Sequence, residues 1–351
     1  MCTAWIGCTG PVDAAGTDHR RFRLPGGRVW VAAGSVLAAV GLFMVLPRAL
    51  GTSWDPVKEV LGALSVRDLT LLTVLWLVGL LSYSAVLTSS LPGLSTRRAM
   101  LLNLSGSAVA NVAPFGGAAG VGLNFAMARS WRFSTASFVT FTAVSNLWNW
   151  LAKLVLAALV LGSLILGGSL PAGALLTALR VALLVVTGVL LAAVSILVVG
   201  SGAATLGRAL DHVVWFRPTS FAMSVPALRT ATAAVVRRRW AHLTGGMAGY
   251  LALQAVLLGT CLHLLGSVLA VPVVLAGFAA ERLITLVPVT PGGAGLADTA
   301  CAGVLVALGG DPVVVAAAVV LYRGFTYLLE IPVGGLGILG WILVRRRRRA
   351  T

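Results

Sequence analysis

Long runs of apolar residues are the feature that most restricts what this chain can fold into. They cover 29–47, 69–91, 134–166, 174–200, 243–266 and 313–344. Most reach the roughly 20 residues that an α-helix needs to cross the hydrocarbon core of a bilayer. Only 10% of the residues are charged, against about 25% in an average soluble domain. We therefore expect an all-α polytopic membrane protein with about six to eight transmembrane helices.

The net charge of +16 suggests a nucleic-acid partner at first sight, but the positions of the basic residues favour a role in membrane topology. Most of them flank apolar runs, in clusters at 20–28, 97–98, 129–132, 201–241 and 345–349. Because cytoplasmic loops are enriched in Lys and Arg, we expect a multi-pass protein of the cytoplasmic membrane with both termini in the cytoplasm. We expect no nucleic-acid partner.

The same pattern divides the chain into segments. We expect a disordered cytoplasmic tail at 1–28, a membrane domain at 29–344 with a basic cytoplasmic loop at 201–241, and a basic tail at 345–351.

Two similar Pro-Gly segments interrupt the apolar sequence, "VAPFGGAAG" at 112–120 and "LVPVTPGGAG" at 286–295. Arginines flank region 100–128 on both sides, and its first leg, 100–113, spans only about 21 Å as a helix. That is too short for roughly 30 Å of hydrocarbon. We therefore expect two re-entrant helical hairpins, at 100–128 and 271–309, that enter from opposite faces. Their turns contain Pro114, Gly116, Gly117, Gly120, Pro288, Thr290, Pro291, Gly292, Gly293 and Gly295.

Each Pro-Gly segment precedes a long apolar run, and an odd number of expected crossings separates the two segments. We therefore expect the halves 100–200 and 243–344 to form an inverted repeat, an arrangement found in transporters. The glycines have two readings. They present free backbone N–H groups to an anion at a helix N-terminus, or they only permit tight turns and close helix packing.

Polar residues within the apolar run 134–166 lie on one helical face, because Asn146, Asn149 and Lys153 follow the spacing i, i+3, i+7. Such residues line a cavity or form interhelical hydrogen bonds, with the lysine extending toward the membrane surface. We treat all three as candidate substrate-binding residues.

The second half carries charges inside its apolar runs. The candidates are Glu281, Arg282, Asp298, Tyr322, Arg323 and Glu330. Because isolated buried ions cost several kcal/mol each, the charges either neutralise one another structurally or hold an arginine ready for a substrate phosphate. Arg323 is the main candidate, since a planar guanidinium binds phosphate bidentately. We expect it within ion-pair reach of Glu281, Asp298 or Glu330.

The cysteines and histidines show no ligand spacing, and the cysteines no disulfide spacing. We therefore expect neither a metal nor a cofactor.

Several of these stretches resemble a known family. "LVPVTPGGAGLADTA" (286–300) and "GDPVVVAAAVVLYRGFTYLLEIPVGGLGIL" (310–339) resemble the lysylphosphatidylglycerol synthase transmembrane region, a flippase-like integral membrane domain family. "NVAPFGGAAGVGLNFAMARSW" (111–131) is similar to the first-half motif, and the resemblance covers about 100–344. It implies two re-entrant elements and translocation of aminoacylated or otherwise modified phospholipids. The family's acidic residue corresponds to Asp298, and its Tyr-Arg pair to Tyr322 and Arg323.

The first half departs from the family pattern. Asn124 stands where many members carry arginine, and the stretch Ser145–Asn149 replaces an E-R-x-x-D pattern. This half is therefore poor in charge. No aminoacyl-transferase domain follows the membrane region, so we expect no synthase activity and no enzyme.

The sequence thus predicts a lipid flippase or transporter that moves a modified, possibly aminoacylated, phospholipid or a lipid-linked substrate. The alternatives are a non-transporting membrane partner of a lipid-modifying enzyme, or a membrane enzyme with Asp298 and Glu281 as acid and base. The expected partners are membrane phospholipid and the lipid substrate, and the candidate protein partners are a second copy of the chain or a lipid-modifying enzyme.

Overall fold

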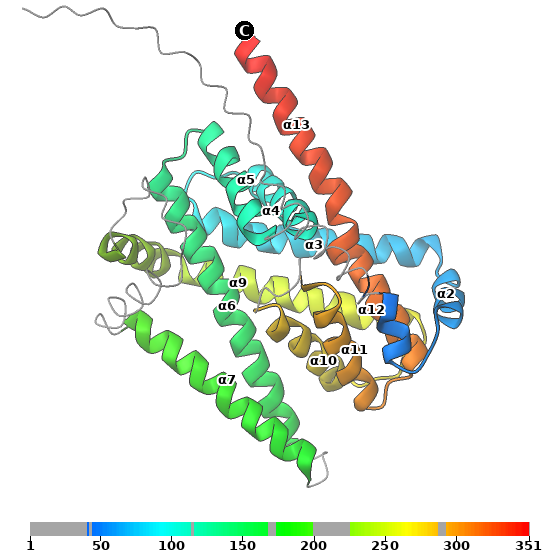
Figure 1. The fold of residues 1–351 in the computed structure, drawn as a ribbon. Coiled ribbons are helices and arrows are strands. Elements are labelled where there is room, and N and C mark those ends of the chain that lie inside the picture. Colours follow the sequence, from blue (N-terminus) through cyan, green and yellow to red (C-terminus); the bar gives the residue numbers. More distant parts are fainter. Residues whose placement is uncertain are drawn as a thin grey trace, which may run out of the picture.

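The computed structural model describes residues 41, 44–113, 116–167, 173–198, 225–286 and 293–350. All regular elements in these ranges are helices (Figure 1), which confirms the predicted all-α class. Four helical stretches in this part of the chain are long and apolar enough to cross a membrane, namely Val66–Ser90, Thr135–Leu166, Ala227–Leu264 and Pro312–Arg347. The predicted total of crossings and the re-entrant hairpins remain predictions.

The helices follow one another without strands between them in the described ranges. They are α2 (Trp54–Gly62), α3 (Val66–Ser90), α4 (Thr96–Val112), α5 (Gly116–Ser130), α6 (Thr135–Leu166), α7 (Ala174–Val198), α9 (Val225–Leu264), α10 (Val271–Ile284), α11 (Leu296–Ala307), α12 (Pro312–Arg323), the π-helical segment Gly324–Leu328 and α13 (Glu330–Ala350).

Local sequence explains several helix starts. Ser65 and Asp68 form a capping box at the start of α3, with the Asp68 carboxylate accepting from the Ser65 N–H at 2.9 Å. Asp311 caps α12 by accepting from the N–H groups of Val313 and Val314. Pro312 follows as the first residue of α12, where its missing N–H costs nothing.

Two long apolar runs prove continuous. The run 134–166 is a single helix, α6, of 32 residues. The run 313–344 passes from α12 through the π-helical segment into α13 without leaving helical structure. Residues 225–241 of the loop expected at 201–241 belong to α9, and residues 201–224 lie outside the described residues. The tail 1–28 lies outside the described residues.

Helices α3 and α9 pack together in opposite directions (Figure 1). Near the C-terminal end of α3, Ser82 Oγ donates to the Gly246 carbonyl at 3.0 Å. The rings of Tyr83 and Tyr250 are 4.9 Å apart between centroids, and Gly79 faces Leu253 one turn earlier in α3. These two antiparallel helices form the centre of the bundle.

Each Pro-Gly segment lies between two helices that pack on each other, α4 with α5 and α10 with α11. Glycines set the close approach. A Cβ at Gly120 of α5 would lie 2.7 Å from the Gly106 carbonyl oxygen of α4, and one at Gly277 of α10 would lie 2.6 Å from the Leu305 side chain of α11. Two short helical hairpins are therefore present, and each precedes a long helix.

The packing of the two hairpins is reciprocal. The first helix of the first hairpin, α4, packs against α13, while the first helix of the second hairpin, α10, packs against α6. Contact between α4 and α13 is close, since a Cβ at Gly334 would lie 2.1 Å from the Leu104 carbonyl oxygen. Each hairpin thus rests on the long helix that follows the other hairpin.

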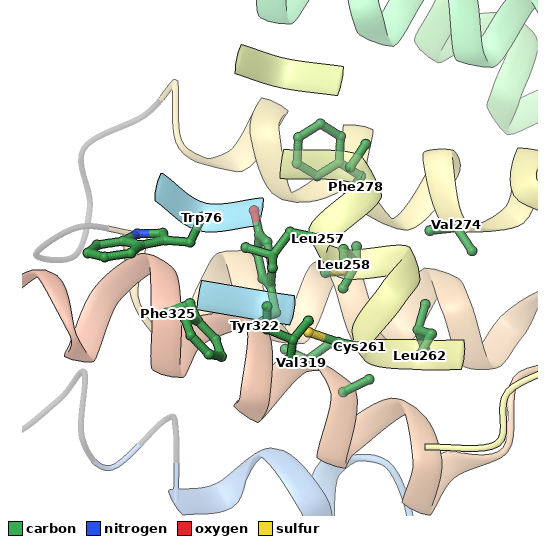
Figure 2. Packing of buried hydrophobic residues seen from close by; sticks show 14 of the residues in the cluster. Trp76, Leu257, Leu258, Cys261, Leu262, Val274, Phe278, Val319, Tyr322 and Phe325 are labelled. Atoms are coloured by element: carbon green, nitrogen blue, oxygen red, sulfur yellow. The ribbon is translucent and has the colours of Figure 1, made fainter. Parts of the chain in front are cut away.

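An apolar core joins α9 to the second hairpin and α12 (Figure 2). Leu257, Leu258 and Cys261 of α9 meet Val319 and Tyr322 of α12 there, and all of them are buried. This core excludes water from one side of the polar cluster described next.

Candidate functional site

Charged residues from three helices come together at the second hairpin. Glu281 and Arg282 lie in the last turn of α10, Asp298 is the third residue of α11, and Arg323 ends α12. All four are buried, and Glu281 and Asp298 are each only 1% exposed. The sequence prediction of a buried charge cluster in this half therefore corresponds to a real assembly of side chains.

Arg323 contacts two carboxylates. Its Nε donates to Asp298 Oδ1, and its Nη2 lies 3.4 Å from Glu281 Oε1. The other oxygen of Asp298, Oδ2, accepts from the Gly295 N–H at 2.8 Å. Asp298 thus holds Arg323 and the end of the second Pro-Gly segment at once. The prediction that Arg323 lies within ion-pair reach of these acids agrees with this geometry.

Arg282 forms the second cationic centre. Its Nη2 donates to Glu281 Oε1 at 3.0 Å and Oε2 at 3.1 Å, and also to the Tyr322 hydroxyl. The guanidinium carbon lies 4.8 Å from the centre of the Phe278 ring, a cation–π arrangement. The Glu281 carboxylate therefore forms ion pairs with both arginines.

Two guanidinium nitrogens form no hydrogen bond among the described residues: Arg282 Nε, and Arg323 Nη2, whose one carboxylate contact is the 3.4 Å ion pair with Glu281. Buried donors are nearly always paired in native proteins. The cluster therefore has hydrogen-bonding capacity that the described residues leave unused.

Lys153 and Glu330 extend the cluster. Lys153 Nζ donates to Thr285 Oγ1 at 3.1 Å, and Thr285 in turn donates to the Arg282 carbonyl at 2.7 Å. Glu330, 7% exposed, lies within electrostatic range of Arg282 and Arg323. The six side chains Lys153, Arg282, Arg323, Glu281, Asp298 and Glu330 have formal charges that cancel.

The polar stripe predicted on α6 divides between two places. Lys153 joins the charge cluster, whereas the Asn146 side-chain amide donates to the Thr142 carbonyl of its own helix at 2.9 Å and lines a separate cavity. Asn149 is partly buried and does not line that cavity.

The cavity has a volume of about 120 Å³ and lies among α3, α4, α5 and α6. Its walls combine side-chain amides and hydroxyls with aromatic rings, and no charged residue lines it. The lining residues are Tyr83, Leu87, Leu102, Asn103, Val121, Asn124, Phe138, Phe141, Thr142, Ser145 and Asn146. Sequence reasoning missed Asn103, although an asparagine inside an apolar segment is itself a signal.

The glycines of the Pro-Gly segments are explained mainly by backbone geometry. Gly293 and Gly295 have φ of +71° and +83°, which glycine adopts readily. A Cβ at Gly116 would lie 1.9 Å from the Ala110 carbonyl oxygen, whereas one at Gly117 would meet nothing within 4 Å. Five predicted turn residues fall outside the described residues: Pro114, Pro288, Thr290, Pro291 and Gly292.

Within the described ranges, no group of three or more His, Cys, Asp or Glu side chains is placed to hold a metal ion.

Comparison with known proteins identifies the family. A comparison with curated proteins finds no match. The family model described as the lysylphosphatidylglycerol synthase TM region matches residues 30–334. The match begins well before residue 100, where the resemblance in the sequence started, and it contains all six members of the charge cluster. The chain therefore belongs to the lysylphosphatidylglycerol synthase transmembrane-region family.

Proposed function

We propose that this integral membrane protein moves a phospholipid, or another lipid with a phosphate in its headgroup, from one leaflet to the other. The observation that carries the proposal is the buried cluster in which Arg282 and Arg323 share one carboxylate, Glu281. We assign the lipid phosphate to these two arginines.

The pairing within the cluster supports a binding role beside a structural one. A purely structural network gains most when every buried donor is satisfied. Here Arg282 Nε and Arg323 Nη2 have no hydrogen-bond partner among the described residues. A phosphate oxygen accepts hydrogen bonds from a guanidinium bidentately, so an incoming phosphate would complete the network. A cationic headgroup, such as an aminoacyl group, would meet Glu281, Asp298 or Glu330.

The arrangement of the hairpins supports a transporter. Helices α4, α5, α10 and α11 contain 17, 15, 14 and 12 residues, which corresponds to about 18–26 Å each and falls short of roughly 30 Å of hydrocarbon. We therefore propose that both hairpins are re-entrant. The reciprocal packing of α4 on α13 and of α10 on α6 supports an inverted repeat, with antiparallel α3 and α9 at its centre.

The distribution of arginines supports a location in the cytoplasmic membrane with both termini in the cytoplasm. The proposed role is transport without catalysis, and it requires no cofactor. Association with a second copy of the chain or with a lipid-modifying enzyme is compatible with this role.

The test compares lipid translocation with stability. The protein is reconstituted in vesicles with phosphatidylglycerol that carries a fluorophore on one acyl chain, and a membrane-impermeant reductant reports which leaflet holds the lipid. Arg323→Lys keeps the charge but loses the planar fork, so translocation should fall while thermal stability changes little. Arg323→Met should abolish translocation. Wild-type translocation per folded molecule in Arg323→Met would refute the assignment of the phosphate to Arg323.

A further inference from the structure

In the inverted repeat that we propose, the cavity of the first half corresponds in position to the charge cluster of the second. Ser145 and Asn146 are the eleventh and twelfth residues of α6, just as Tyr322 and Arg323 are the eleventh and twelfth of α12. Ser145 and Asn146 line the cavity, and Arg323 binds the acids of the cluster. The two halves therefore present different chemistry at corresponding positions.

A pair of tyrosines lies between the two sites. Tyr83 lines the cavity, and its ring is 4.9 Å from that of Tyr250 between centroids. Tyr250 lies within electrostatic range of Glu281, Arg282 and Glu330 in the cluster. The tyrosine pair thus connects the wall of the cavity to the surroundings of the charge cluster.

The chemistry of the cavity selects against charged groups. Its polar lining consists of amides and hydroxyls, from Asn103, Asn124, Asn146, Thr142 and Ser145, together with Tyr83. Burying an ion here without a partner of opposite charge would cost several kcal/mol. A ligand hydroxyl group, in contrast, can both donate and accept hydrogen bonds. The side-chain amides of asparagine offer both the matching acceptor and the matching donor.

Two further observations point to a hydroxylated ligand. The Asn124 Oδ1 acceptor is buried and has no hydrogen-bond partner among the described residues. The rings of Phe138 and Phe141, 5.6 Å apart between centroids, both line the cavity, and their electron-rich faces suit the C–H groups of a polyol or sugar ring. The volume of about 120 Å³ far exceeds the roughly 10–15 Å³ that a single water requires.

We infer that this cavity binds the uncharged, polyhydroxylated part of a lipid headgroup, such as a sugar, inositol or glycerol group, while the phosphate binds the arginine cluster. The inference rests on the proposed lipid transport and defines its substrate class. Asn124 accepts a hydrogen bond from a headgroup hydroxyl, and Asn146, an exposed residue of α6 that lines the same cavity, offers a second amide. At the two positions where the resemblance implies charged residues, this chain carries Asn124 and Asn146, and we assign to them a preference for an uncharged headgroup.

The test uses three lipids of equal charge, each with the fluorophore on an acyl chain. Phosphatidylinositol, phosphatidylglycerol and phosphatidylethanol share one anionic phosphodiester, and their headgroups decrease in size and in number of hydroxyl groups in that order. We expect wild-type protein to move them in that order, fastest first. Asn124→Leu should slow phosphatidylinositol about tenfold, the size expected for one lost buried hydrogen bond, and slow phosphatidylethanol much less, so the ratio of the two rates should fall. Equal rates for all three lipids in wild-type protein would overturn the inference.

A second, less disruptive variant separates an effect on the cavity from an effect of misfolding in Asn124→Leu. Thr142→Val removes a hydroxyl from the cavity wall without changing side-chain shape, and should also reduce the preference for phosphatidylinositol. Thr260→Val is the matched control, because both hydroxyls donate to the carbonyl four residues earlier but Thr260 does not line the cavity. An equal preference in Thr142→Val and Thr260→Val would argue against the cavity.

Binding separates this inference from the transport proposal. Lipid retention by purified protein is measured by native mass spectrometry with the same three lipids. If wild-type protein moves none of them but retains phosphatidylinositol preferentially, and Asn124→Leu abolishes that preference, transport is refuted and the headgroup site stands. If all three lipids move equally and bind equally, transport stands and the headgroup site is refuted.

Discussion

Asn111 and Tyr327 exchange two hydrogen bonds across the two halves of the protein. The Asn111 side-chain amide donates to the Tyr327 carbonyl at 3.3 Å, and the Tyr327 hydroxyl donates to the Asn111 carbonyl at 2.7 Å. Asn111 lies in the last turn of α4, just before the first Pro-Gly segment, and Tyr327 lies in the π-helical segment that follows Arg323. This pair therefore connects the tip of the first hairpin to the helix that carries the proposed phosphate-binding arginine.

The pair should be energetically coupled. Tyr327→Phe and Asn111→Ala each remove one hydrogen bond donated by a side chain, and each should lower the free energy of unfolding by about 1 kcal/mol. Because the two residues contact each other, the effects should be non-additive in the double variant. Thermal or denaturant unfolding of the four proteins in one detergent measures this. Strict additivity would show that the two residues act independently.

Glycine packing gives a second prediction, with a matched control on the same helix. Gly120→Ala places a Cβ 2.7 Å from the Gly106 carbonyl oxygen, whereas Gly117→Ala has open space around it. Overpacking costs about 1–3 kcal/mol, while alanine in place of glycine within a helix gains up to about 1 kcal/mol. Gly120→Ala should therefore lower the melting temperature and Gly117→Ala should hold or raise it. The opposite order would contradict the observed packing of α4 on α5.

Charge removal within the cluster should destabilise the protein strongly at Asp298 and little at Lys153. Asp298 accepts from both Arg323 and the Gly295 N–H, so Asp298→Asn leaves a buried arginine without its main partner and should destabilise by about 3–5 kcal/mol. Lys153 has no carboxylate oxygen within salt-bridge distance among the described residues and is bonded to the neutral Thr285. Lys153→Met should therefore change stability little. Comparable losses in both variants, measured by thermal unfolding, would show that Lys153 is paired after all.

Chemical labelling of introduced cysteines can test the predicted membrane topology. Val268, between α9 and α10, is 99% exposed, and Ser95 precedes α4 next to two arginines. We expect a membrane-impermeant maleimide to react with Val268→Cys from outside intact cells, and with Ser95→Cys only after the membrane is opened. The background variant replaces Cys2 and Cys8 with serine, and Cys261 and Cys301 are buried, so labelling reports the introduced cysteine. Labelling of Val268→Cys only after lysis would contradict the inverted repeat.

The sequence predicted the helices well because apolar length and helix formation go together in a membrane protein. It also anticipated that Arg323 pairs with an acid, since an isolated buried charge costs too much to be tolerated. The early start of α9 escaped prediction for a physical reason. The charge of Arg237, Arg238 and Arg239 favours a solvated loop, but arginine is a good helix former and all three lie within α9.

The cavity was harder to foresee because its walls come from four helices and no local spacing reports their meeting. The polar stripe on α6 predicted one shared site for its residues, and this is only partly right. Asn146 and Lys153 share one face, but they lie about 10 Å apart along the helix axis, so they reach two different sites. The π-helical segment Gly324–Leu328 could not be predicted from the length of the apolar run, because one extra residue in a turn does not change how apolar the run is.

The cancelling charges of the cluster have an electrical consequence. A unit charge that crosses a membrane potential of 100 mV gains or loses about 2.3 kcal/mol. Lys153, Arg282, Arg323, Glu281, Asp298 and Glu330 carry three positive and three negative formal charges. In the transport that we propose, a rearrangement that moved all six side chains would carry no net formal charge through the field, so the voltage would act at this cluster only on the charge of the bound lipid.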